Sequence, residues 1–190
     1  MSQTLISEYK LKLIDKKLLE TKLKEMKSLI EKEPKIIDKI EIIWLGGNEL
    51  GYKDNLEYNF KQDVEAVKTV FKSKVKLTII PCKNVASNLR TSIYELEHFL
   101  KGKNELCDYL CQRFYNDGVH GIQERRVIWD ISVIAYIINK EWFNTEEISC
   151  PNINDDTSYE LTEHNHKITV VNYLNVDKIY RDLFKKLGEV

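Results

Sequence analysis

The sequence lacks several features that would assign it to whole classes of protein. No apolar stretch approaches the roughly 20 residues that a helix needs to cross a bilayer. The N-terminus, Met1-Ser2-Gln3-Thr4, has no charged-then-apolar signal pattern. There is no excess of basic residues either, because the formal net charge is −1. Since proteins that bind nucleic acids or membrane surfaces usually carry a concentrated basic surface, we expect neither kind of partner.

Cysteine is scarce, and its spacing matches no metal site. Cys107 and Cys111 are four residues apart on a predicted helix, so they could touch each other. Buried free thiols are the simpler interpretation of these two and of Cys82 and Cys150. Together with the missing signal pattern, the cysteines indicate a cytoplasmic protein.

What the sequence does contain is typical of a folded globular chain. It has 190 residues, 43% hydrophobic and 31% charged, which is enough to bury a core. We find no internal repeat and no low-complexity tract. Apolar residues at three- and four-residue steps predict a lysine-rich amphipathic helix within residues 1–33, which Pro34 ends. Residues 34–190 are predicted to form an α/β domain.

The apolar pattern of this domain alternates between strands and helices. Short β-branched runs predict buried strands at residues 40–45, 76–80 and 167–173. The helical stripes lie at residues 64–71, 87–100, 106–115, 127–138 and 176–187, the last capped by Asn175. This alternation predicts an open, mainly parallel sheet with helices on both faces. Because such sheets bind ligands at the carboxyl ends of their strands, we expect the site around residues 46–59 and 81–87.

The loop after the first strand carries three polar side chains at alternate positions, Asn55, Glu57 and Asn59. In extended backbone, alternate side chains share one face. A carboxylate between two amides is well suited to holding the vicinal hydroxyls of a sugar. The alternative is a polar surface loop in which the asparagines form turns.

A second motif, Trp129-Asp130, stands at the start of an apolar helical run. Asp130 could complement the helix dipole, or it could ligate a hard cation. Trp129 could belong to the core, or its indole could stack on a planar base. The sequence leaves both pairs of alternatives open.

In order and spacing, these motifs resemble the C-terminal portion of the nucleoside hydrolases, the inosine–uridine-preferring ribohydrolases. The resemblance covers about residues 29–187. It rests on Trp44-Leu45-Gly46-Gly47-Asn48, Glu57-Tyr58-Asn59-Phe60 with Asp63-Val64-Glu65-Ala66-Val67, Pro81-Cys82-Lys83-Asn84-Val85, and Val127-Ile128-Trp129-Asp130. It implies a nucleoside-hydrolase-like fold and cleavage of the N-glycosidic bond of a ribonucleoside.

The resemblance also implies roles for individual residues. Asn55, Glu57 and Asn59 would bind the ribose hydroxyls and the 5′ side, and Asp130 would be a calcium ligand. Many members place a histidine before that aspartate as the acid that protonates the leaving base. Here the residue is Trp129, as in the purine-preferring branch, where an aromatic side chain stacks on the base. His120 is then the candidate catalytic acid, with a surface histidine as the alternative.

One departure from the family concerns its opening aspartate cluster, which holds most of the calcium and includes the base. This chain has only the isolated Asp15 and Asp38 in that region, so we expect a shortened or N-terminally replaced member. Calcium needs six to eight oxygen ligands, and Asp130 supplies at most two. Two functions follow: a (purine) nucleoside hydrolase that is weak or inactive alone, or a non-catalytic module that binds a nucleoside or ribose or serves in a homo-oligomer.

Overall fold

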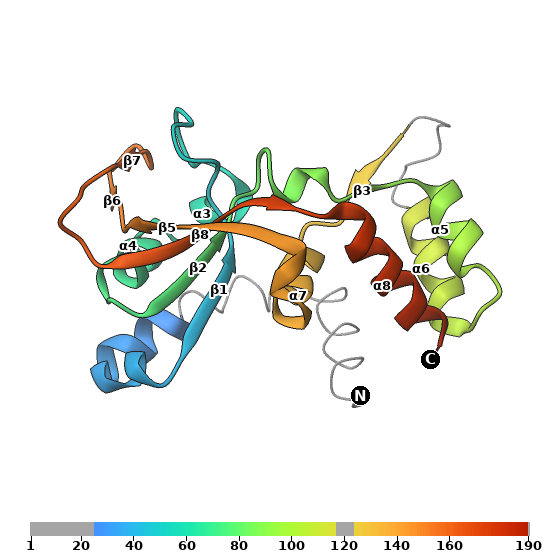
Figure 1. Ribbon diagram of the computed structural model, residues 1–190, viewed down its shortest axis with the longest axis horizontal. Helices are drawn as coiled ribbons and strands as arrows, with labels where there is room; N and C mark the ends of the chain where they lie inside the picture. The colour runs from blue at the N-terminus through green and yellow to red at the C-terminus, as the bar shows by residue number, and fades with distance from the viewer. Residues whose placement is uncertain (1–24, 117–123, 190) are drawn as a thin grey trace.

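A four-stranded sheet forms the centre of the computed structural model, which describes residues 25–116 and 124–189 (Figure 1). The strand order is β1-β2-β8-β5. The first three strands are parallel and β5 is antiparallel to β8, which confirms the predicted mainly parallel sheet. The bounds are β1 (Glu41–Leu45), β2 (Lys76–Ile80), β8 (Lys167–Leu174) and β5 (Phe143–Ser149).

The strands divide their apolar side chains between two core clusters, one on each face of the sheet. On β1, Ile42 and Trp44 pack into one cluster, while Ile43 and Leu45 pack into the other. This alternation follows from the geometry of a strand, in which successive side chains point to opposite faces. The predicted strands correspond to β1, β2 and β8. No apolar run marks β5 in the sequence, because its central residues are exposed and polar and lie in an edge strand of the sheet.

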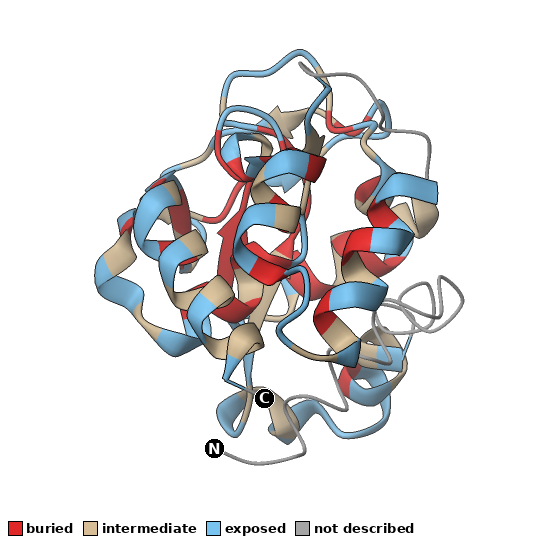
Figure 2. Cartoon of the chain, turned by 90° about the vertical axis from the view of Figure 1, so that its right-hand side faces the viewer, coloured by how far each residue is buried: buried red, intermediate tan, exposed pale blue. Residues whose placement is uncertain are grey.

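Helices cover both faces of the sheet, as predicted. One face is packed by residues 25–32 and by α4, and the other by α7 and α8. A third cluster joins α5 and α6 to the end of α8. Figure 2 shows the buried residues along the strands and on the inward sides of these helices. The bounds are α4 (Val64–Lys72), α5 (Ile93–Leu100), α6 (Glu105–Asn116), α7 (Ile131–Ile138) and α8 (Val176–Gly188).

Two helices begin later than the sequence predicted. The predicted starts at residues 87 and 127 fall on segments that contain the paired short strands β3 (Arg90–Thr91) and β4 (Arg126–Val127). The helix α5 begins only after Ser92, where Ser92 and Glu95 form a reciprocal capping box. Beyond β4, the N–H of Ile128 donates to the carbonyl of Leu89 at 2.8 Å. This pairing brings the Trp129-Asp130 motif back toward the segment that follows β2.

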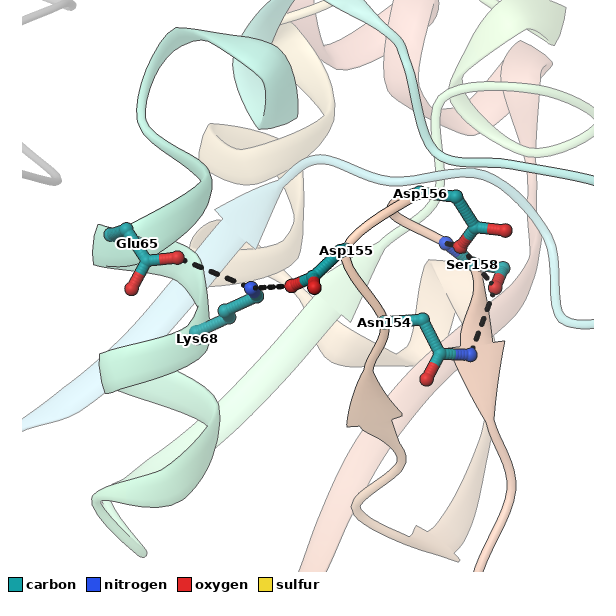
Figure 3. A network of polar contacts seen from close by, with 6 residues as sticks. All are labelled: Glu65, Lys68, Asn154, Asp155, Asp156 and Ser158. Carbon is teal, nitrogen blue, oxygen red and sulfur yellow. Dashed lines mark hydrogen bonds and ion pairs between the residues drawn. The ribbon is translucent and has the colours of Figure 1, made fainter.

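A small hairpin, β6 (Asn152–Ile153) and β7 (Tyr159–Glu160), packs beside α4. Its tip is tied to that helix by an ion pair between Lys68 and Asp155, 2.7 Å apart (Figure 3). The short helical segments are η1 (Pro34–Asp38), α3 (Tyr58–Gln62), η2 (Ala86–Asn88) and η3 (Lys140–Trp142). Within the described ranges, no helix has both the length and the apolarity that crossing a membrane demands.

Candidate functional site

The segments that follow β1 and β2 stay side by side beyond the strand ends. The N–H of Gly46 donates to the carbonyl of Ile80 at 3.2 Å, and the N–H of Cys82 donates to the carbonyl of Gly47 at 2.8 Å. Gly47 has a φ of +70°, and a Cβ added there would lie 2.1 Å from the phenol oxygen of Tyr159. Only glycine fits such a position without rearrangement. The backbone at the carboxyl end of the sheet is therefore tightly constrained.

Asn55 holds the loop after β1 against the tip of the β6–β7 hairpin. Its side chain is fully buried. The Oδ1 atom accepts a hydrogen bond from the N–H of Asn48 at 2.6 Å, and Nδ2 donates to the carbonyl of Thr157 at 2.7 Å. The backbone N–H of Asn55 donates to Oγ1 of Thr157 at 3.1 Å. Asn55 thus has a structural role, and contact with a sugar stays a prediction.

Glu57 is the N-cap of α3, and its half-buried carboxylate is fixed by three backbone N–H groups. One oxygen accepts from Phe60 at 2.7 Å and from Gly47 at 2.9 Å. The other accepts from Asn59 at 2.6 Å. Such bonds to an ionised group are among the stronger protein hydrogen bonds. The carboxylate is therefore held in one orientation at the end of β1.

Asn59 does not continue an extended row of side chains. Because α3 begins at Tyr58, Asn59 lies in a helical turn, and its Nδ2 donates to the carbonyl of Leu45 at 2.9 Å. The premise of an extended backbone from residue 55 to residue 59 was therefore wrong. The structure still keeps Glu57 and Asn59 together at the end of β1.

Trp129 and Asp130 lie at the start of α7 and are more open to solvent. Trp129 is 38% exposed, and its carbonyl accepts hydrogen bonds from the N–H and the hydroxyl of Ser132. Asp130 is the exposed N-cap residue of α7, and its side chain makes no capping hydrogen bond. Its place at the N-terminus of α7 still allows the interaction with the helix dipole, so both alternatives for Asp130 stay predictions.

Cys82, directly after β2, connects the two parts of the site. Its side chain is buried. Burial raises the pKa of the Cys82 thiol well above its usual value, with further contributions from the charge of Glu57 and a hydrogen bond to it, and from the charge of Asp130. Both carboxylates thus lie close enough to act on a single thiol. The sequence predicted Cys82 to be a buried thiol and placed residues 81–87 around the site, but it gave Cys82 no role of its own.

The described side chains do not form a complete cation site. Calcium requires six to eight oxygen ligands. In residues 25–116 and 124–189, no three histidine, cysteine, aspartate or glutamate side chains lie together as a metal-binding group. A role for Asp130 as a ligand stays a prediction. The candidate acid His120 lies outside the described residues.

The family model of the inosine-uridine preferring nucleoside hydrolases matches residues 25–181. The chain belongs to this family. The resemblance expected over about residues 29–187 is therefore confirmed. Among curated protein sequences, no match is significant.

Solved nucleoside hydrolases share the fold. The inosine-uridine preferring enzyme from Bacillus anthracis is 18% identical with a TM-score of 0.67, and 87% of the present chain covers 57% of that protein. The purine-preferring ribonucleoside hydrolase from Gardnerella vaginalis is 15% identical with a TM-score of 0.71, and the match covers 88% of the present chain and 58% of that protein. An inosine-guanosine nucleoside hydrolase is 11% identical with a TM-score of 0.68, and the match covers 87% of the present chain and 58% of that protein. The chain thus spans well under two thirds of the length of these proteins.

Proposed function

We propose that the chain binds a ribonucleoside at the carboxyl ends of the parallel strands, with the ribose between Glu57 and Asp130. One observation carries the proposal: the charges of both carboxylates contribute to the raised pKa of the Cys82 thiol, so both residues lie in its neighbourhood. Glu57 comes from the loop after β1, and Asp130 from the start of α7. Two carboxylates near one thiol, each from a separate element, can accept hydrogen bonds from vicinal hydroxyls of one sugar.

The geometry of Glu57 suits a group that binds rather than one that reacts. Three backbone N–H groups orient its carboxylate, so little rearrangement is needed when a hydroxyl approaches. Asn55 and Asn59 hold the same loop in place, and we propose that they reach the ribose and its 5′ side. The exposure of Trp129 supports the proposal that its indole stacks on a base. A purine is the proposed base, in line with the names of two of the similar structures.

Catalysis of N-glycosidic hydrolysis has further requirements. A carboxylate must activate a water molecule, and the leaving base must receive a proton. Glu57 already accepts three backbone hydrogen bonds, so we do not assign it the role of the base that activates water. For the proton donor to the leaving base, we propose His120. A calcium ion held with the help of Asp130 would supply positive charge beside the ribose hydroxyls, but the described residues do not complete its ligand shell. We therefore propose that this chain alone cleaves (purine) ribonucleosides weakly or not at all.

The second candidate function is a non-catalytic module that binds nucleoside or ribose, or that assembles with another copy. The incomplete set of metal ligands among the described residues favours it. The four free, buried cysteines support our further proposal that the protein resides in the cytoplasm.

One experiment separates these functions. The purified chain is titrated with inosine in a calorimeter, with and without calcium, and hypoxanthine release is assayed on the same samples. Inosine affinity with calcium-dependent turnover supports the hydrolase. Inosine or ribose affinity without turnover supports the binding module. Absence of both affinity and turnover would reject a nucleoside site in this chain.

A further inference from the structure

We propose that a second pocket binds the phosphate group of a small phosphorylated molecule. This pocket lies at the amino ends of the parallel strands, opposite the candidate ribose site. The pocket has a volume of about 500 Å³, within the usual range for ligand sites. Its basic lining comes from Lys72, Lys74, His164 and His166. Because β2 begins at Lys76 and β8 at Lys167, these residues stand at the amino ends of the parallel strands. The candidate ribose site lies at the carboxyl ends.

The charge of this pocket is only partly neutralised by the protein. Lys68 also lines it, but its ammonium group is paired with Asp155 at 2.7 Å and with Glu65 at 3.2 Å (Figure 3). Lys72 and Lys74 form no ion pair with any described residue. Two ammonium groups are thus left to face an anion. Lysine is a common phosphate ligand in proteins.

The backbone at Lys74 gives a second, independent reason to assign a role to its side chain. Lys74 has a φ of 65°, in the left-handed region that glycine adopts far more easily than a residue with a Cβ. It ends the turn between α4 and β2, where glycine would form the same turn with less strain. Non-glycine residues held in this region cluster at sites that bind ligands, which supports a role for Lys74 in the pocket.

The remaining lining supports a phosphate ester rather than free phosphate. The Nε2 atom of His166 is buried and has no hydrogen-bond partner among the described residues. Burial, and then the charge of Lys74, lowers the pKa of His166. An anion beside Lys74 would offset that charge. Phe71, Pro151 and Ile153 add an apolar wall, which suits an organic group attached to the phosphate.

Phenyl phosphate is a suitable probe, because it has no sugar and its binding does not depend on the proposed ribose site. The full chain is titrated calorimetrically with phenyl phosphate, inorganic phosphate and phenol. We expect saturable binding of phenyl phosphate, weaker binding of inorganic phosphate, and none of phenol. In proton–nitrogen spectra, the ring signals of His164 and His166 should shift during the titration, while those of His98 on α5 should not. The absence of saturable phenyl phosphate binding would overturn the proposal.

Two matched double variants test the residues. Lys72→Gln/Lys74→Gly removes both ammonium groups, and glycine fits the backbone of residue 74. We expect affinity for phenyl phosphate to fall about tenfold or more, since bonds to charged groups are strong. Lys101→Ala/Lys178→Ala removes the same charge near α5 and α8, at the other end of the molecule from α4 and β6 (Figure 1), and should leave affinity unchanged. Equal weakening in both variants would show a general effect of surface charge and reject the pocket.

Discussion

The two halves of the candidate ribose site differ in how the protein holds them. In the loop after β1, Asn55 and Glu57 make several hydrogen bonds to backbone groups. At the start of α7, Trp129 and Asp130 are exposed, and the Asp130 carboxylate does not cap the helix. Substitutions in the loop should therefore lower stability and binding together, whereas those at α7 should affect binding with little loss of stability. This contrast can be tested from the largest expected effect to the smallest.

The largest effect is expected for Gly47→Ala. The new Cβ would lie 2.1 Å from the Tyr159 oxygen, at a φ of +70°. Left-handed strain and overpacking together should lower the free energy of unfolding by about 2–5 kcal/mol, measured by urea denaturation. Gly51→Ala is the matched control, because Gly51 has a φ of +88° but no atom within 4 Å of an added Cβ. Equal losses in the two variants would show that the contact with Tyr159 is unimportant.

A somewhat smaller loss is expected for Asn55→Ala. The substitution leaves the N–H of Asn48 and the carbonyl of Thr157 without their partners in a buried region. At about 1–2 kcal/mol for each of these two unsatisfied groups, the lower part of the usual range, the free energy of unfolding should fall by about 2–4 kcal/mol. Asn154→Ala removes an exposed hydrogen bond to Ser158 and should change stability by only about 0.5 kcal/mol. If Asn55→Ala behaves like this control, the loop is not held as described.

The α7 half is tested by Trp129→Ala. Trp129 is 38% exposed, so the loss of stability should stay below the roughly 3–5 kcal/mol typical of a fully buried tryptophan. Loss of base stacking should weaken inosine binding about tenfold. Free ribose should bind nearly as before, since it has no base. Equal weakening for inosine and ribose, measured by calorimetry, would place Trp129 in the core instead.

The smallest effects concern Cys82, where the halves meet. The pKa of this thiol is raised in the folded chain above 9.0, the ordinary pKa of a cysteine thiol. Above that pH the thiol ionises more easily in the unfolded chain, so the stability that it contributes at neutral pH is lost as the pH rises. Alkylation of Cys82 by iodoacetamide at pH 9 should be slow in the folded protein. Glu57→Gln should accelerate it, and Asp130→Asn should do so less, because Glu57 is the larger of the two charge effects. Mass spectrometry of the Cys82 peptide measures the rates.

The prediction is contradicted if neither Glu57→Gln nor Asp130→Asn changes the rate at which Cys82 is alkylated. In that case the two carboxylates would not both act on Cys82. An increase for Glu57→Gln alone would separate Asp130 from the site. Cys150, which is also buried and whose pKa burial alone raises to about 12, is the internal control.

The sequence predicted those parts of the fold whose signals are local. Apolar runs located β1, β2 and β8, and the predicted cap Asn175 does accept a hydrogen bond from the N–H of Lys178. The strand β5 was missed because polar side chains mask its alternation. The pair β3 and β4 was missed because two residues show no period, so the adjoining helices were extended across them.

The candidate site could be predicted in its residue types but not in its contacts. Glu57 and Asp130 were selected from motifs near strand or helix ends. The partner of Asn55 is Thr157, 102 residues further along the chain, and no local pattern shows that pairing. The position of Cys82 beside Glu57 depends on the register of β1 against β2. Such contacts are set by tertiary packing, which spacing along one chain does not specify.

The central claim is that Glu57 and Asp130 face one ribose. It is tested most directly by calorimetric titration of inosine into the wild-type chain, Glu57→Gln and Asp130→Asn under the same calcium concentration. Both substitutions keep the shape and remove the charge, and glutamine retains an acceptor for the backbone of α3. We predict that each variant binds inosine about tenfold more weakly or worse, with its unfolding midpoint nearly unchanged for Asp130→Asn. Wild-type affinity in either variant would contradict the account.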